Sequence, residues 1–141
     1  MAGFLLDTNV LSEFARALPA DPRVDGWLKA TPEELLFASI LTFAEIRRGI
    51  ELLPAGKRRT QLEEWQADIE TSFASRLLPV TKTIGDRWAI LSAQAQRRGT
   101  PLAIMDGFIA ATALEHDLTV ATRNVKDFAG LGVTVFNPWE A

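Results

Sequence analysis

The sequence predicts an α/β fold in which a central parallel sheet of about five strands has helices on both faces. Short apolar runs alternate with amphipathic stretches along the whole chain, a pattern that favours parallel strands joined by right-handed crossovers. The first run, 4–6, is continuously apolar, as expected for a strand buried on both faces. At 141 residues the chain fits one domain, 1–141, which is long enough to bury a core without disulfides.

Each element follows from its local pattern. Asp21 followed by Pro22 is typical of a helix start, and Leu62, Trp65, Ile69 and Phe73 form one apolar stripe at helical spacing. The expected strands are 4–6, 35–39, 77–80, 118–122 and 133–136. The expected helices are 10–16, 22–30, a stretch up to residue 49 that carries Glu45, 57–73, 84–98, and one that starts near Asp106.

Composition excludes several classes of protein. There is no cysteine, which excludes disulfides and thiolate zinc sites, and the single His116 disfavours a histidine metal cluster. No basic segment precedes the first apolar run, and no uncharged run reaches the roughly 20 residues of a membrane helix. We therefore expect a cytoplasmic protein without membrane contact. The net charge of −3 neither supports nor excludes RNA binding, since a local basic patch would suffice.

Asp7 ends the first predicted strand. In open α/β sheets the ligand crevice lies beyond the carboxyl ends of the strands, where the strand order reverses, so an acid at this position suits chemistry. The alternative is that Asp7 only caps the following helix, because Asp is a preferred N-cap residue. The stretch itself leaves both interpretations open.

Asp106 is the only charged residue between Pro101 and Leu114. A buried carboxylate is so unfavourable that it takes up a proton, pairs with a cation or binds a metal, and no basic residue lies nearby in sequence. The alternatives are a helix N-cap or a carboxylate that faces solvent.

Four positions follow a predicted strand or open a helix: Asp7, Glu45, Asp106 and either Asp127 or Asn124. All four could therefore lie in one crevice. Carboxylates that lie close together repel each other unless a hard cation balances their charge. Ligands that are all oxygen favour Mg²⁺ or Mn²⁺ over zinc. A metal held in this way activates water and stabilises charge on a phosphoryl group, so we expect phosphodiester hydrolysis.

These residues resemble the signatures of the PIN-domain nucleases and, within them, of the VapC-type toxins of type II toxin–antitoxin pairs. The resemblance spans the chain in four stretches, which are 7–12 (DTNVLS), 45–49 (EIRRG), 106–111 (DGFIAA) and 122–128 (TRNVKDF). It implies that Asp7 and Asp106 are the principal Mg²⁺ ligands. It also implies that Glu45 and a fourth residue, Asp127 or Asn124, act directly or through water.

The same resemblance implies a Mg²⁺-dependent endoribonuclease toxin. Its partners would be an RNA substrate, a small cognate antitoxin and a second copy in a homodimer, with DNA contacted only through the antitoxin. Asn9 and Thr122 would support the site by hydrogen bonds, which is usual for metal sites.

Two other functions remain open. One is a catalytically weak PIN module that binds its antitoxin and helps it to repress DNA. The other is a phosphatase similar to the haloacid dehalogenases, although Asn9 stands where that family has a second Asp.

Five cations could contact RNA phosphates, although a charged surface residue is more often only solvated. They are Arg47, Arg48, Arg87, Arg123 and Lys126. Glu45 and Arg48 could equally form a plain i, i+3 surface pair.

Overall fold

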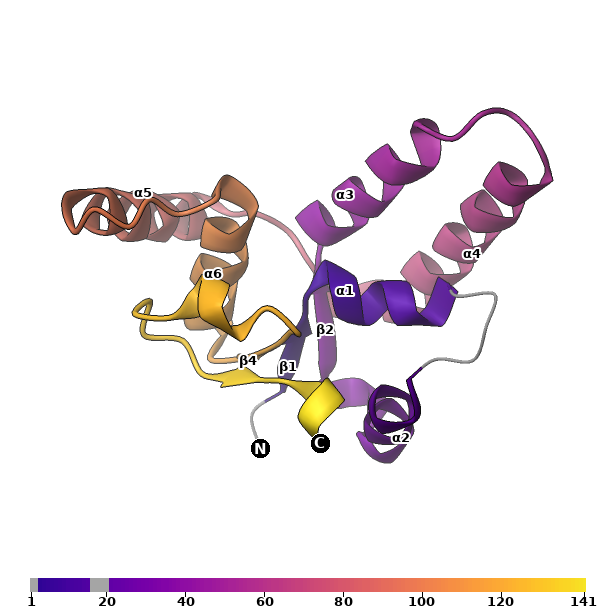
Figure 1. Cartoon of the computed structure of the whole chain (residues 1–141), viewed down its shortest axis with the longest axis horizontal. Helices are drawn as coiled ribbons and strands as arrows, with labels where there is room; N and C mark the ends of the chain where they lie inside the picture. The colour runs from indigo at the N-terminus through magenta and orange to yellow at the C-terminus, as the bar shows by residue number, and fades with distance from the viewer. Residues whose placement is uncertain (1–2, 16–20) are drawn as a thin grey trace.

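The computed structural model describes residues 3–15 and 21–141. Figure 1 shows a central sheet between two groups of helices. All strand pairs are parallel, in the order β3-β2-β1-β4-β5. The strands are β1 (Phe4–Leu6), β2 (Leu36–Ser39), β3 (Leu77–Leu78), β4 (Thr119–Ala121) and β5 (Val135–Phe136). The predicted α/β class and its five parallel strands are confirmed.

Apart from α1, the α-helices of the described residues lie where the patterns predicted them, with small shifts at their ends. They are α1 (Thr8–Leu11), α2 (Pro22–Ala30), α3 (Ile40–Glu51), α4 (Lys57–Phe73), α5 (Lys82–Arg97) and α6 (Ile104–His116). Short 3₁₀ turns are η1 (Ser12–Ala15), η2 (Glu33–Leu35), η3 (Ala74–Arg76), η4 (Val125–Phe128) and η5 (Pro138–Glu140). As predicted, Asp21 caps α2, because its carboxylate accepts the Arg23 N–H at 2.9 Å.

The helix predicted over 10–16 differs from the observed one. Asp7 caps it directly, so α1 begins at Thr8, and after Leu11 the chain continues as the 3₁₀ turn η1. The predicted last residue, Arg16, lies outside the described residues.

Successive strand residues point to opposite faces of the sheet, and the two faces carry separate cores. Leu6 packs with Val10, Phe43 and Phe73 of α1, α3 and α4. Leu5 packs with the α6 residues Ile109, Ala110 and Ala113, against which Leu91 of α5 is also packed. Helices therefore cover both faces, as predicted.

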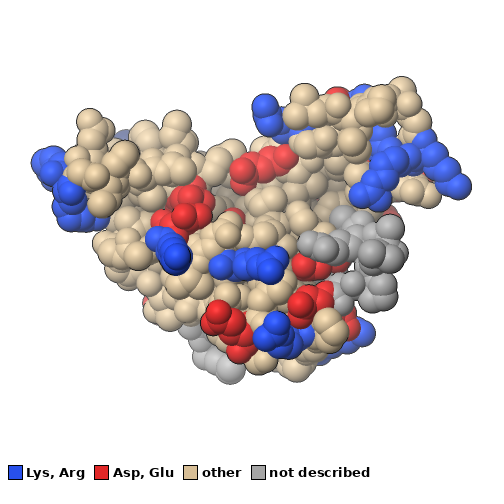
Figure 2. Space-filling model, viewed as in Figure 1, with Lys and Arg blue, Asp and Glu red and all other residues tan. Residues whose placement is uncertain are grey.

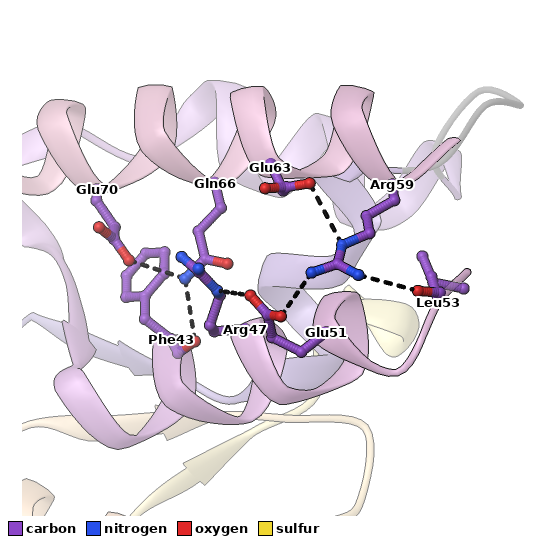
Figure 3. Close-up of polar contacts among 8 residues, drawn as sticks. All are labelled: Phe43, Arg47, Glu51, Leu53, Arg59, Glu63, Gln66 and Glu70. Carbon is purple, nitrogen blue, oxygen red and sulfur yellow. Dashed lines mark hydrogen bonds and ion pairs between the residues drawn. The ribbon is translucent and has the colours of Figure 1, made fainter. Parts of the chain in front are cut away.

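Figure 3 shows polar contacts within α3 and α4 and between the two helices. The Arg59 guanidinium donates to Glu51 at 2.6 Å and also lies 3.4 Å from Glu63. Deeper in, the Gln66 amide donates to the Phe43 carbonyl at 3.1 Å and to Glu70 at 2.8 Å. The bonds to Glu51 and Phe43 join α4 to α3, the helix that carries Glu45.

The strand order determines where a site can form. The chain passes from β1 to β2 on one side and later returns to β4 on the other, so the order reverses at β1. Leu6 lies opposite Ala121 in the register, which puts Asp7 beside Thr122 at the carboxyl edge. Within the described ranges, no helix is both long and apolar enough to span a membrane.

Candidate metal centre

Asp7 lies at the carboxyl end of β1 with only 8% of its surface exposed. One carboxylate oxygen, Oδ1, accepts the Thr8 N–H at 2.9 Å, and the other, Oδ2, accepts the Thr122 hydroxyl at 2.8 Å. The capping interpretation is therefore correct for one oxygen. Since each carboxylate oxygen has two acceptor positions, the cap does not prevent a second role for this side chain.

Thr122 connects the ends of β1 and β4. Its buried hydroxyl donates to Asp7 and accepts the Asn9 amide at 3.2 Å and the Asn124 backbone N–H at 3.0 Å. One donor and two acceptor positions are all that a hydroxyl offers, so its proton is committed to Asp7. The Arg123 backbone N–H donates to the side-chain amide oxygen Oδ1 of Asn9 at 3.3 Å. The hydrogen bonding expected of Asn9 and Thr122 is thus observed.

Glu45 lies in the second turn of α3 and is half-buried. Its carboxylate accepts the Thr8 hydroxyl at 2.9 Å, which links α1 to α3 across 37 positions of sequence. In the described part of the chain no cation pairs with Glu45, so the surface pair with Arg48 is not formed. Sequence reasoning missed Thr8, and its only signal was a hydroxyl next to the acid that ends a strand.

Asp106 lies in the first turn of α6, but it does not cap that helix. The N-cap is Ala103, whose side chain makes no capping bond, so the capping alternative for Asp106 is wrong. Among the described residues its half-buried carboxylate has no ion pair. Burial raises its pKa to about 6, with further contributions from the charges of Asp7, Asp127 and Glu45, in that order.

Those contributions show that three acids from other elements act on Asp106. Asp127 is exposed in the turn η4, and together with Asp106 it lines a hollow of about 280 Å³. Asn124 begins the same turn, and its side chain makes no capping bond. The structure therefore brings Asp7, Glu45, Asp106 and Asp127 to one edge of the sheet. Which residue fills the fourth position remains a prediction.

The chemistry of these side chains fits a hard divalent cation. The four acids offer only carboxylate oxygens as ligands, and the charges of the other three add to burial in raising the pKa of Asp106. In residues 3–15 and 21–141 no three acidic or histidine side chains converge tightly enough to enclose an ion as they lie. Mg²⁺ keeps several of its waters and takes only one or two carboxylates from a protein, so an open group of acids suits it. Figure 2 shows acidic side chains on both sides of the depression between the lobe of α5 and α6 and the lobe of α3 and α4.

A second concavity lies beside Glu45. Its volume is about 430 Å³, and its lining includes the apolar residues Ile46, Leu62 and Trp65 together with Arg58 and Glu45 itself. Trp65 is half-buried here, so the stripe predicted for α4 packs only partly into the core. We refer to this concavity as the α3–α4 groove.

Comparisons with known proteins agree with this architecture. The family model described as "PIN domain" matches residues 4–132. The chain is similar to VapC ribonuclease Y4jK of Sinorhizobium fredii, with 41% identity over 96% of this chain and 97% of the relative. It is also similar to toxin FitB of Neisseria gonorrhoeae, with 43% identity over 96% of this chain and 97% of the relative.

Solved structures match over nearly the full length. The crystal structure of FitAcB from Neisseria gonorrhoeae matches with a TM-score of 0.90 and 42% identity, over 98% of this chain and 99% of that chain. A toxin–antitoxin complex from Klebsiella pneumoniae matches with a TM-score of 0.71 and 27% identity, over 98% of both chains. The family match covers far more than half of the sequence, and the four stretches that resembled the family lie within it: the chain belongs to the PIN domain family.

Proposed function

We propose that this chain is a metal-dependent endoribonuclease that acts as the toxin of a toxin–antitoxin pair. The observation that carries the proposal is the position of Asp106, a half-buried carboxylate on which Asp7, Asp127 and Glu45 all act. The similarity to a VapC ribonuclease and to a toxin supports the choice of substrate and role. Membership of the PIN domain family leaves the haloacid-dehalogenase alternative without support.

In this proposal Asp7 and Asp106 hold Mg²⁺ or Mn²⁺, and Glu45 and Asp127 act on the ion directly or through water. The bound ion would lower the pKa of a water molecule and stabilise the charge that develops on the phosphoryl group. The surrounding residues keep the carboxylates in place. The Thr122 hydroxyl orients Asp7, and the Thr8 hydroxyl orients Glu45.

Cleavage of labelled RNA in Mg²⁺, Mn²⁺, Ca²⁺ and EDTA tests the activity. We expect cleavage in Mg²⁺ and Mn²⁺, little in Ca²⁺ because its looser coordination positions water less well, and none in EDTA. Undiminished cleavage in EDTA would overturn the mechanism. Failure to cleave under every condition, with an antitoxin still bound, would favour the weak module that acts only through its partner.

The α3–α4 groove supports the expected antitoxin. An apolar segment would cover Ile46, Leu62 and Trp65, and an arginine from the same segment would reach Glu45 in the lining of the groove. Arginine suits this role because its guanidinium pairs with carboxylates through two parallel hydrogen bonds.

Co-expression with a candidate antitoxin, sought as a short reading frame directly upstream of the gene, tests this partner. The parent should be toxic alone, and its partner should restore growth and co-purify with it. Leu62→Asp, which places a charge in the groove, should abolish co-purification. Ile90→Asp is a matched control on an exposed site of α5 and should retain it. Equal co-purification of both variants would exclude the α3–α4 groove as the binding site of the antitoxin. The homodimer stays a prediction, which light scattering of the purified chain checks.

A further inference from the structure

The hollow beside Asp106 and Asp127 also has cations in its wall. Arg98 and Lys126 line it together with the two acids. Its volume of about 280 Å³ lies just below the roughly 300–1,000 Å³ of pockets for drug-sized ligands. The hollow therefore suits a small group, such as one segment of a longer chain, that lies next to the acids.

Both cations remain available to an outside anion. Arg47 pairs with Glu51 at 2.6 Å and Arg87 with Glu115 at 2.8 Å. Arg98 and Lys126 form no ion pair with any described residue, although two carboxylates line the same hollow. Both side chains are exposed, so a ligand can reach them.

Backbone turns fix the positions from which the Arg98 and Lys126 side chains extend. Arg98 is the C-cap of α5, and the chain turns there because Gly99 adopts φ +77°, a conformation that favours glycine. The Gly99 N–H donates to Gln96 and the Thr100 N–H to Ala95, both at 3.0 Å, which closes the turn.

Lys126 lies in η4, the turn that carries Asp127. Phe128, buried in the core beneath α6, anchors that turn from below. The Asn124 N–H fastens its start to the Thr122 hydroxyl.

We propose that Arg98 and Lys126 form a subsite for a backbone phosphate of RNA, next to the phosphodiester that is cleaved at the acids. This inference rests on the proposed nuclease function. A cluster of acids repels RNA, so cations close to it are needed to hold the strand in register. Contacts to phosphates position a nucleic acid without reading its sequence, and arginine suits phosphate through paired hydrogen bonds.

The test compares Arg98→Gln and Lys126→Gln with Arg97→Gln. Arg97 is exposed in the last turn of α5, does not line the hollow, and undergoes the same change of charge. Binding of a labelled single-stranded RNA is measured by fluorescence anisotropy in EDTA over a range of salt concentrations. Melting temperatures of all the variants check that they fold.

We expect Arg98→Gln and Lys126→Gln each to raise Kd about fivefold at low salt. Each should also reduce the slope of log affinity against log salt by about 0.7. In Mg²⁺ their KM should rise with little change in kcat, while Arg97→Gln behaves like the parent.

Three results would overturn the subsite. If the parent binds and cleaves RNA and all three variants match it, the subsite is wrong and the nuclease stands. If Arg98→Gln and Lys126→Gln weaken antitoxin binding and leave RNA affinity unchanged, the surface belongs to the antitoxin. If the parent neither binds nor cleaves RNA, both the proposed nuclease function and the proposed subsite are wrong.

Discussion

Asp106 shows how the site raises the free energy of the folded protein. Its pKa moves from an ordinary 3.8 to about 6, first through burial and then through the neighbouring acids. Between these two values the folded state binds more protons than the unfolded state, so this residue lowers stability as pH rises through that window. Above about pH 6 its destabilising effect is fully present.

We predict that Asp106→Asn removes this pH-dependent contribution, because it keeps the shape of the side chain and deletes the repelled charge. Urea unfolding in EDTA at pH 4, 5, 6 and 7 measures it. The gain in stability of the variant over the parent should grow from pH 4 to pH 6 and then level off. Asp117→Asn is the control, at the opposite end of the same helix. A gain that is independent of pH, or a variant far less stable than the parent, would contradict this assignment.

For individual residues, the sequence predicts the acidic side chains better than it predicts the side chains that hydrogen-bond to them. Asp7, Glu45 and Asp106 stand out because each follows a strand or interrupts an apolar stretch. The Thr8 hydroxyl bond to Glu45 could not be predicted, since it depends on how α3 packs beside α1. The same holds for Arg98, which looks like an ordinary basic residue at a helix end until α6 and η4 are placed around it.

At the scale of elements, the contact between α5 and α6 sets the position of Asp106. Trp88 of α5 stacks on Phe108 of α6, with 4.9 Å between ring centroids and 4° between planes. Gly107 allows this close approach, because a Cβ there would lie 2.8 Å from Trp88 Cδ1 and 3.1 Å from Leu102 Cδ2. The residue after Asp106 is therefore fixed against the neighbouring helix.

We predict that Gly107→Ala lowers stability by about 1–3 kcal/mol through overpacking and reduces RNA cleavage, because the first turn of α6 must shift. Gly85→Ala is the matched control in α5, where a Cβ would meet nothing within 4 Å. It should leave activity unchanged and leave stability equal or higher, because Ala is the better helix former. Chemical denaturation and cleavage assays measure both effects. A Gly107→Ala variant as stable as the parent would show that Trp88 moves aside freely.

The positions of the helices and strands were predictable because each has its own local sequence pattern. The residues at which they begin and end were less predictable. The two-residue strands β3 and β5 are shorter than the apolar runs that predicted them, since pairing with a neighbour, and not hydropathy, decides where a strand ends.

At the scale of the whole molecule, the strand order brings acidic residues from distant parts of the sequence to one edge of the sheet. Alternation along the chain predicted a parallel sheet but not the order β3-β2-β1-β4-β5. That order depends on which helices cover which face, and it reverses at β1, where Asp7 lies. The acids that follow β1 and lie in α3, α6 and η4 then meet at one edge, where Asp7, Asp127 and Glu45 add to burial in raising the pKa of Asp106.

The central claim is that these acids form one metal site, and thermal melting with added Mg²⁺ tests it most directly. A ligand that binds only the folded state raises its stability, so the melting temperature of the parent should rise with Mg²⁺ concentration. The rise should largely disappear in Asp106→Asn and persist in Asp117→Asn. In EDTA, Asp106→Asn should melt at or above the temperature of the parent. An equal response to Mg²⁺ in all three proteins would contradict the account.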